Sequence, residues 1–262
     1  MTLAVSVLVL SGVGVLVALW AIQLRTRDAA TADVGWTILV AGGAIAAAVL
    51  GDGDPYRRLL VAGLATLWAL RLGAYLLRDR VLPRRGEPHR GEDGRYRALR
   101  EYWGAAAPRN FLFVYLGQAV VAALFIAPLM VAMRGGSVDL WCIGGILVWL
   151  VAVGGEMIAD RQLARFRADP STRGTVCRVG LWRYSRHPNY FFEWLHWWAY
   201  VVIGHAAWLT YLGPVAMLLF LFRITGIPYT ERQALRSRGD AYRAYQRTTS
   251  IFFPWPPRGS VA

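Results

Sequence analysis

Long apolar stretches constrain this chain more than any other feature of its sequence. They cover residues 3–24, 34–51, 59–77, 111–133, 138–158, 189–205 and 207–227. A helix needs about 20 mostly apolar residues to cross the hydrocarbon core of a bilayer. Because 56% of the residues are apolar and the mean hydropathy is +0.37, little length remains for a water-soluble domain. The sequence therefore predicts an all-α polytopic membrane protein with seven transmembrane helices.

The basic residues predict the orientation of these helices. All 29 are arginines, and most lie at 25–27, 78–109, 161–186 and 232–258, which fall on one side of the predicted topology. Cytoplasmic loops are enriched in basic residues. We therefore expect the N-terminus outside and the C-terminus in the cytoplasm. The chain would form a single membrane domain over 1–262, with cytoplasmic loops at 78–110 and 159–188, a cytoplasmic tail at 229–262, and arginines in contact with anionic lipids.

Other classes of function gain no support from the sequence. The two cysteines and four histidines show no metal-ligand spacing, so we expect no metal. No basic and aromatic soluble module is present, so we expect no nucleic-acid partner. No Gly-x-Gly-x2-Gly motif follows a strand, which excludes a Rossmann-type nucleotide site.

The polar segments also carry helical patterns. Residues 93–101 predict an amphipathic helix at the membrane surface, and 161–167 extend the preceding helix until Asp169-Pro170 ends it. A short helix is predicted at about 229–247, before a proline-rich end. We expect an aromatic belt at the membrane–water interface, formed by Trp182, Tyr184, Trp194, Trp197 and Trp198.

The stretch at 189–205 carries polar residues on one helical face. Asn189, Glu193 and His196 are followed on this face by Trp197 and Tyr200. A glutamate one turn inside a membrane helix faces protein or a water-filled cavity rather than lipid. The plainer interpretation is that Asn189 caps the helix and Glu193 forms a salt bridge.

Two other helices carry ionisable residues. Glu156, Asp160 and Arg167 share a face at the end of 138–158, where a local ion pair is the plainer interpretation. Arg71 lies inside 59–77 and shares a face with Trp68 and Tyr75, so it needs a partner such as a carboxylate or a ligand phosphate.

Asp33 lies at the start of another apolar helix, where the plainer interpretation is that it caps the helix. Taken together, carboxylates and arginines gathered at cytoplasmic helix ends favour a pocket for a phosphate-bearing cofactor.

One segment carries a resemblance to a known family. The string Gly180-Leu-Trp-Arg-Tyr-Ser-Arg-His-Pro-Asn-Tyr-Phe-Phe-Glu-Trp194 resembles the bacterial branch of the steroid 5α-reductase family. The resemblance extends to 33–36, 67–72, 92–96, 160–166 and 242–254. It implies a seven-helix reductase in the bacterial inner membrane. Such an enzyme would transfer a hydride from NADPH to the conjugated C=C bond of an apolar enone lipid, such as a 3-oxo-4-ene steroid arriving from the bilayer.

The resemblance also implies roles for individual residues. Asp160, Arg167, Asn189 and Glu193 match positions that contact the cofactor, and the remaining cofactor-binding candidates are Arg71, Arg186, His187 and Tyr190. Asp33 falls near the acidic group that polarises the substrate carbonyl, where desolvation would favour its protonated form. Trp68 stands where the family has a catalytic tyrosine and cannot supply a phenolic proton. Either Tyr75 or Asp33 replaces it, or the substrate is not a 3-oxo-4-ene steroid.

The Arg-His-Pro-x-Tyr core leaves a second function open. Membrane methyltransferases of the isoprenylcysteine and phospholipid type carry a similar element that binds S-adenosylmethionine. NADPH has phosphates and S-adenosylmethionine has none, so the many arginines favour NADPH. A non-catalytic lipid-binding protein, which would bind neither cofactor, is a third possibility.

Overall fold

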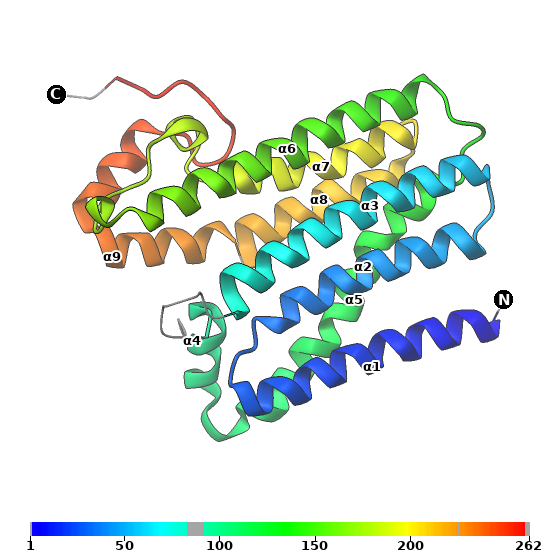
Figure 1. The fold of residues 1–262 in the computed structure, drawn as a ribbon, viewed down its shortest axis with the longest axis horizontal. Helices are drawn as coiled ribbons and strands as arrows, with labels where there is room; N and C mark the ends of the chain where they lie inside the picture. The colour runs from blue at the N-terminus through cyan, green and yellow to red at the C-terminus, as the bar shows by residue number, and fades with distance from the viewer. Residues whose placement is uncertain (1, 83–91, 225, 260–262) are drawn as a thin grey trace. The chain divides into compact units, whose positions relative to one another are not determined.

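The computed structural model describes residues 2–82, 92–224 and 226–259, which form helices and connecting turns (Figure 1). Within these ranges no strand occurs, and the all-α prediction is confirmed. Parts of the predicted loop at 78–110 and of the tail, namely 83–91 and 260–262, lie outside the described residues. The chain divides into two compact units. The first unit is Met1–Cys142 with Gly204–Leu212, and the second unit is Ile143–Ile203 with Gly213–Ala262.

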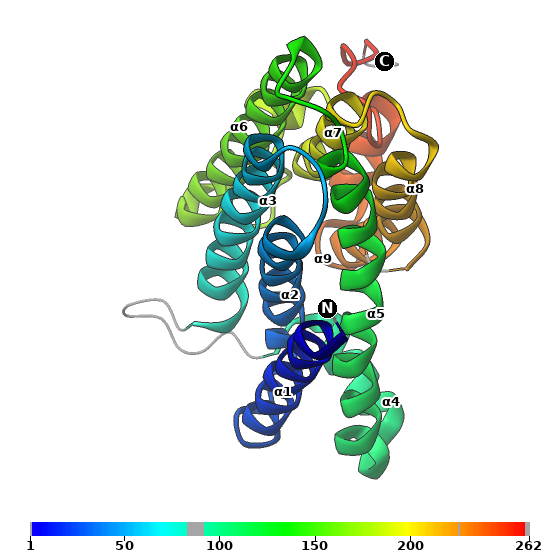
Figure 2. The same cartoon turned by 90° about the vertical axis from the view of Figure 1, so that its right-hand side faces the viewer.

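The first unit is built around α2. This helix packs against α3 and α5, and α1 packs against both α2 and α5 (Figure 2). The short helix α4 contacts α5, where Tyr96 joins a buried cluster with Phe111 and Tyr115. The helices are α1 (Thr2–Thr26), α2 (Thr31–Leu50), α3 (Pro55–Leu76), α4 (Gly94–Trp103) and α5 (Ala107–Met133).

Aspartates mark helix starts in the first unit. Asp54 accepts a hydrogen bond from the Arg57 amide and precedes Pro55, an arrangement that favours the start of α3. Asp93 caps α4 in the same way. The expectation that Asp33 is a helix cap is wrong, because α2 already starts at Thr31 and Asp33 lies within its first turn.

The second unit contains the rest of the chain. Its helices are α6 (Leu140–Ala168, from Ile143 onward), α7 (Pro188–Ile203), α8 (Leu212–Leu219) and α9 (Ile227–Thr248), with a 3-10 turn at Gly180–Arg183. Helix α6 ends just before Asp169-Pro170, as predicted. The single helix expected at 207–227 is instead a 3-10 turn (Trp208–Tyr211), α8 and a π turn (Phe220–Ile224). Pro228 contributes to this ending, because it lacks the amide that would continue the preceding helix and instead opens α9.

Six helical segments among the described residues are long and apolar enough to cross a membrane. They are Val9–Thr26, Thr31–Leu50, Pro55–Val81, Gly94–Met133, Leu140–Ala168 and Trp208–Thr248. This number supports an integral, multi-pass membrane protein. Helix α7 has only 16 residues and is not among the six. The seventh span and the orientation of the termini therefore stay predictions.

Glycines allow α6 and α7 to pack closely within the second unit. A Cβ atom at Gly145 would lie 2.8 Å from the carbonyl oxygen of Ala199, and one at Gly155 would collide with the ring of Phe192. Small residues let helices approach in this way inside membranes, where packing contacts drive their association. The approach fixes α7, which carries the predicted cofactor residues, against α6.

We predict that Gly145→Ala destabilises the protein by about 1–3 kcal/mol, because the backbone of Ala199 cannot move aside as a side chain can. Gly154→Ala in the same helix is the matched control, since a Cβ atom there meets nothing within 4 Å. Denaturant unfolding in detergent measures both. Equal losses for the two variants would contradict close packing at Gly145.

Candidate active site

Glu231 of α9 is the centre of a hydrogen-bond network in the second unit. Its Oε1 accepts from Arg186 Nε at 2.8 Å and from the Tyr242 hydroxyl at 3.0 Å, and it lies 3.1 Å from His187 Nε2. Its Oε2 accepts from Arg186 Nη2 at 3.3 Å and from the Gln246 side chain. One carboxylate therefore joins α9 to the Arg-His-Pro turn that precedes α7.

This network requires α9 to fold back on itself. A straight α-helix would separate Glu231 from Gln246 by about 22 Å, at 1.5 Å per residue. The two side chains are nevertheless hydrogen-bonded, because the helix breaks at Gly239, where φ is 50° and ψ is −122°. A positive φ of this kind favours glycine, which has no Cβ to clash.

Arg186 is held from several sides. Besides Glu231, its Nη1 donates to the carbonyl oxygens of Thr249 at 2.7 Å and Gln246 at 3.1 Å. Its backbone amide donates to the carbonyl oxygen of Ser250 at 2.8 Å. Such fully bonded geometry lets a guanidinium group be buried at low cost. The structure thus uses Arg186, a predicted cofactor residue, to attach the C-terminal segment.

His187 lies between this network and the start of α7. Its ring stacks on that of Tyr190, with ring centroids 5.4 Å apart and planes 8° apart. Burial lowers the pKa of His187, and its hydrogen bond to the Glu231 carboxylate only partly opposes this effect. The neutral imidazole is therefore favoured at physiological pH, and its neighbour Tyr190 is held in a defined orientation.

The structure brings together Asp160 and Asn189, two predicted cofactor residues. Asn189 Nδ2 donates to Asp160 Oδ1 at 3.3 Å, so Asn189 bonds across to α6. Asp160 and Glu193 are buried, and Glu156 is also buried one turn before Asp160. Arg167, in contrast, is exposed near the end of α6. The second unit thus presents buried carboxylates and an amide, with exposed Arg167 two turns further along α6.

The polar face of α7 continues beyond Glu193. His196 Nε2 lies 3.0 Å from the Tyr200 hydroxyl, and both residues are fully buried. The aromatic belt expected here is only partly present, because Trp182 and Trp197 are buried and belong to the core. Trp182 instead donates a hydrogen bond to the carbonyl oxygen of Ala159 at 2.9 Å.

In the first unit, Asp33 binds to three donors. Arg80 Nη1 and Arg95 Nη2 both donate to its Oδ2 at 2.7 Å, and the Tyr96 hydroxyl donates to its Oδ1 at 2.6 Å. Two guanidinium groups favour a carboxylate over a carboxylic acid. The expectation of a protonated Asp33 therefore disagrees with its surroundings. The π turn at Leu77–Val81 places Arg80 within reach.

The remaining predicted residues of the first unit lie on α3. Trp68 is fully buried, and its ring meets that of Trp36 edge to face with centroids 5.6 Å apart. Arg71 lies 5.6 Å from the centroid of the Tyr75 ring, a cation–π contact. This contact gives Arg71 one of the partners that a membrane helix requires.

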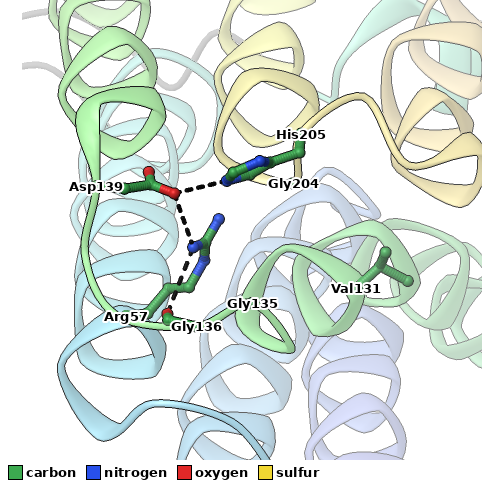
Figure 3. Close-up of a pocket in the computed structure, with 7 residues that line it drawn as sticks. All are labelled: Arg57, Val131, Gly135, Gly136, Asp139, Gly204 and His205. Carbon is green, nitrogen blue, oxygen red and sulfur yellow. Dashed lines mark hydrogen bonds and ion pairs between the residues drawn. The ribbon is translucent and has the colours of Figure 1, made fainter.

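A cavity of about 270 Å³ lies elsewhere in the first unit (Figure 3). Arg57 extends into its wall and is almost completely buried; its donors reach the carbonyl oxygen of Ala132 at 3.1 Å and Asp139 Oδ2 at 3.5 Å. His205 Nε2 lies 2.7 Å from the same carboxylate oxygen. Acceptors already surround the guanidinium group, so this cavity offers little to an anionic ligand.

The sequence analysis identified neither Glu231 nor the cluster of Arg57, Asp139 and His205 beside the cavity. Glu231 lies 45 residues from Arg186, in an arginine-rich segment for which the sequence predicted only a short helix. Its one sequence signal was its acidic character in a segment where arginines outnumber acidic residues. Arg57 lies in the first turn of α3, Asp139 just before α6 and His205 just after α7, and no spacing relates them.

Comparisons of the sequence with known proteins identify its family. Residues 19–249 match the family described as "Protein of unknown function (DUF1295)". The chain belongs to the DUF1295 family. The DUF1295 family is part of the steroid 5α-reductase-like superfamily.

Two relatives of this DUF1295 protein differ in what is known of them. An uncharacterised protein of Schizosaccharomyces pombe is 25% identical over 90% of this chain and 75% of its own length. Methanethiol S-methyltransferase of Mycobacterium tuberculosis is 35% identical over 111 residues, which is 39% of this chain and 41% of the relative. No solved structure matches the chain.

We predict that Glu231→Ala lowers the free energy of unfolding of this DUF1295 protein by about 3–5 kcal/mol, because Arg186 would stay buried without its carboxylate. The control is Asp240→Asn in the same helix, whose ion pair with Arg243 is exposed and should matter little. Denaturant titration in detergent measures both variants. Similar stability of the Glu231→Ala and wild-type proteins would refute the central role of Glu231.

A second prediction concerns pH. Partial desolvation raises the pKa of Asp139, but hydrogen bonds from Cys142 and His205 outweigh it and hold this pKa at about 2. Since the folded value is below the unfolded value of about 4, the carboxylate stabilises the fold above pH 4 and loses this effect as pH falls toward 2. Fluorescence-monitored acid unfolding should therefore be less steep over this range for Asp139→Asn, whereas Asp240→Asn should resemble wild type.

Proposed function

We propose that this protein is a membrane reductase that transfers a hydride from NADPH to the conjugated C=C bond of an apolar enone lipid, with a 3-oxo-4-ene steroid as one possible substrate. The observation that carries the proposal is the Asp160–Asn189 pair, with Glu193 buried one turn further along α7. A carboxamide and ribose hydroxyls need both acceptors and donors in a concave site, and this set offers both. Membership of the steroid 5α-reductase-like superfamily supports the same class of enzyme.

The remaining cofactor residues take different roles in this proposal. Exposed Arg167 is suited to bind a phosphate, since its guanidinium is not buried in the core. Arg186 and His187 position the turn before α7, and Tyr190 is oriented through its stack on His187. NADPH would supply the hydride, and the side chains would bind and orient it.

The residues that the resemblance implies for the substrate are Asp33, Trp68 and Tyr75. The carbonyl of an enone becomes an enolate when the β-carbon receives a hydride, and a proton must then reach the α-carbon. Trp68 can donate a hydrogen bond but no phenolic proton. Because two arginines favour the carboxylate form of Asp33, we assign proton donation to Tyr75 or to water. Asp33 would act by holding Arg80 and Arg95 in place.

A methyltransferase is the second candidate, and one observation favours it. The relative named methanethiol S-methyltransferase is 35% identical over its matched segment. S-adenosylmethionine carries a positive sulfonium group and no phosphate, so buried carboxylates such as Asp160 and Glu193 would suit it as well. The arginines would then have no cofactor phosphate to bind.

Ligand titration of the detergent-purified protein tests the proposal. A ligand that binds only the folded state raises its thermal stability by mass action. We expect NADPH at 100 times its Kd to stabilise the protein by about 2.7 kcal/mol. Stabilisation by S-adenosylmethionine alone would establish the methyltransferase instead, and no response to either would favour a non-catalytic protein.

Variants test which residues bind NADPH. Glu193→Gln and Arg167→Ala should each weaken the NADPH response at least several-fold, because one loses a buried acceptor and the other a phosphate partner. Asp240→Asn, on an exposed position of α9, is the control and should respond as wild type. Normal NADPH binding by both site variants would exclude these residues from the site.

A further inference from the structure

A compact patch of exposed aromatic and basic residues forms where the C-terminal segment crosses the turn before α7. Three backbone hydrogen bonds hold it together: Trp255 N to Tyr184 O at 3.0 Å, Arg258 N to Thr248 O at 2.9 Å, and Arg186 N to Ser250 O at 2.8 Å. The tail patch consists of Arg183, Tyr184, Arg247, Phe253, Trp255 and Arg258.

The aromatic residues of the tail patch are exposed. Trp255 is 71% exposed, Phe253 56% and Tyr184 41%. Single exposed apolar residues are common, but three large ones gathered together mark an interaction surface. The patch also carries three arginines, and no acidic residue occurs in the sequence after Asp240.

The buried neighbour Phe252 makes this surface rigid. Its ring centroid lies 5.2 Å from that of Phe222, 5.7 Å from that of Phe191 and 5.7 Å from that of Trp194. The Ser185 hydroxyl also donates to the carbonyl oxygen of Phe252 at 2.7 Å. The exposed rings therefore project from a fixed backbone rather than from a loose tail.

Hydrogen bonds also define the position of the tail patch along the axis of α6. Leu181 N donates to the Gln162 side chain, and Trp182 Nε1 donates to the carbonyl oxygen of Ala159. This part of α6 is where its long apolar stretch gives way to Asp160 and Arg161. Such a transition marks the boundary between the hydrocarbon core and the headgroups.

We propose that the tail patch is seated in the headgroup layer of a bilayer containing anionic phospholipids. Trp255 and Tyr184 have the apolar body and polar edge that suit this depth. Arg183, Arg247 and Arg258 complement the phosphate groups of the lipids, each contributing through charge attraction near the surface. This role is independent of NADPH and of the reaction.

Depth-dependent quenching tests the proposal on the full-length protein in nanodiscs. Wild type and Trp255→Phe are compared, so that the difference in tryptophan fluorescence reports Trp255 alone. We expect the Trp255 signal to be quenched by a phospholipid with a spin label on its headgroup and protected from aqueous iodide. Quenching by iodide but not by the labelled lipid would show that the patch faces water or a protein partner, and would overturn the proposal.

A second measurement tests the charges. Phosphatidylglycerol should raise the thermal stability of wild type above that in phosphatidylcholine, and Arg247→Gln with Arg258→Gln should lose at least half of that rise. Arg134→Gln is the control, because Arg134 is exposed in the connection between α5 and α6 and lies outside the patch. An undiminished rise in the double variant would refute lipid binding by these arginines. Loss of the NADPH response with the lipid response intact would do the same and make them cofactor ligands.

Discussion

An apolar environment tolerates an ionisable side chain only when its hydrogen-bonding groups are satisfied, and this requirement organises both units of the protein. Arg186 is buried because Glu231 and two backbone carbonyls accept its hydrogen bonds. Arg57 is buried for the same reason, with Asp139 and the carbonyl of Ala132 as acceptors. Each cluster joins segments that are distant in sequence, so satisfying the charge also fixes the connections between helices.

The same requirement separates residues that hold the protein together from the residues that we propose for the cofactor. Arg186 and Glu231 are saturated by each other and by the backbone, which suits a framework. Asp160, Asn189 and Glu193 form a smaller set of buried acceptors and donors on α6 and α7, and close packing at Gly145 keeps these helices in register. A site for a polar cofactor is best built on such rigid helices, because misplacement by even 1 Å is costly for a reaction.

The sequence predicted what depends on local chemistry and missed what depends on distant contacts. Hydropathy located the apolar helices, and Asp169-Pro170 located the end of α6, because both signals act on neighbouring residues. Glu231 could not be paired with Arg186, because the break at Gly239 that brings Tyr242 and Gln246 back to it leaves no periodic signal.

The burial of the aromatic residues expected at the membrane–water interface was equally hard to predict. Trp182 and Tyr184 are two residues apart and equally suited to an interface, yet Trp182 is buried against α6 and Tyr184 is exposed. Likewise, Asp33 looked like a cap or an acid, because its partners Arg80 and Arg95 lie 47 and 62 residues away. Which polar group satisfies which other one is decided by the fold rather than by composition.

The break at Gly239 has a stereochemical consequence for the whole second unit. The backbone there adopts dihedral angles that L-amino acids avoid, so the reversal of α9 is available to the one achiral residue of the genetic code. Nothing crowds this position, since a Cβ atom there would meet no neighbour within 4 Å. Chirality, not lack of space, therefore restricts position 239 to glycine. D-alanine would fit there, whereas L-alanine would not.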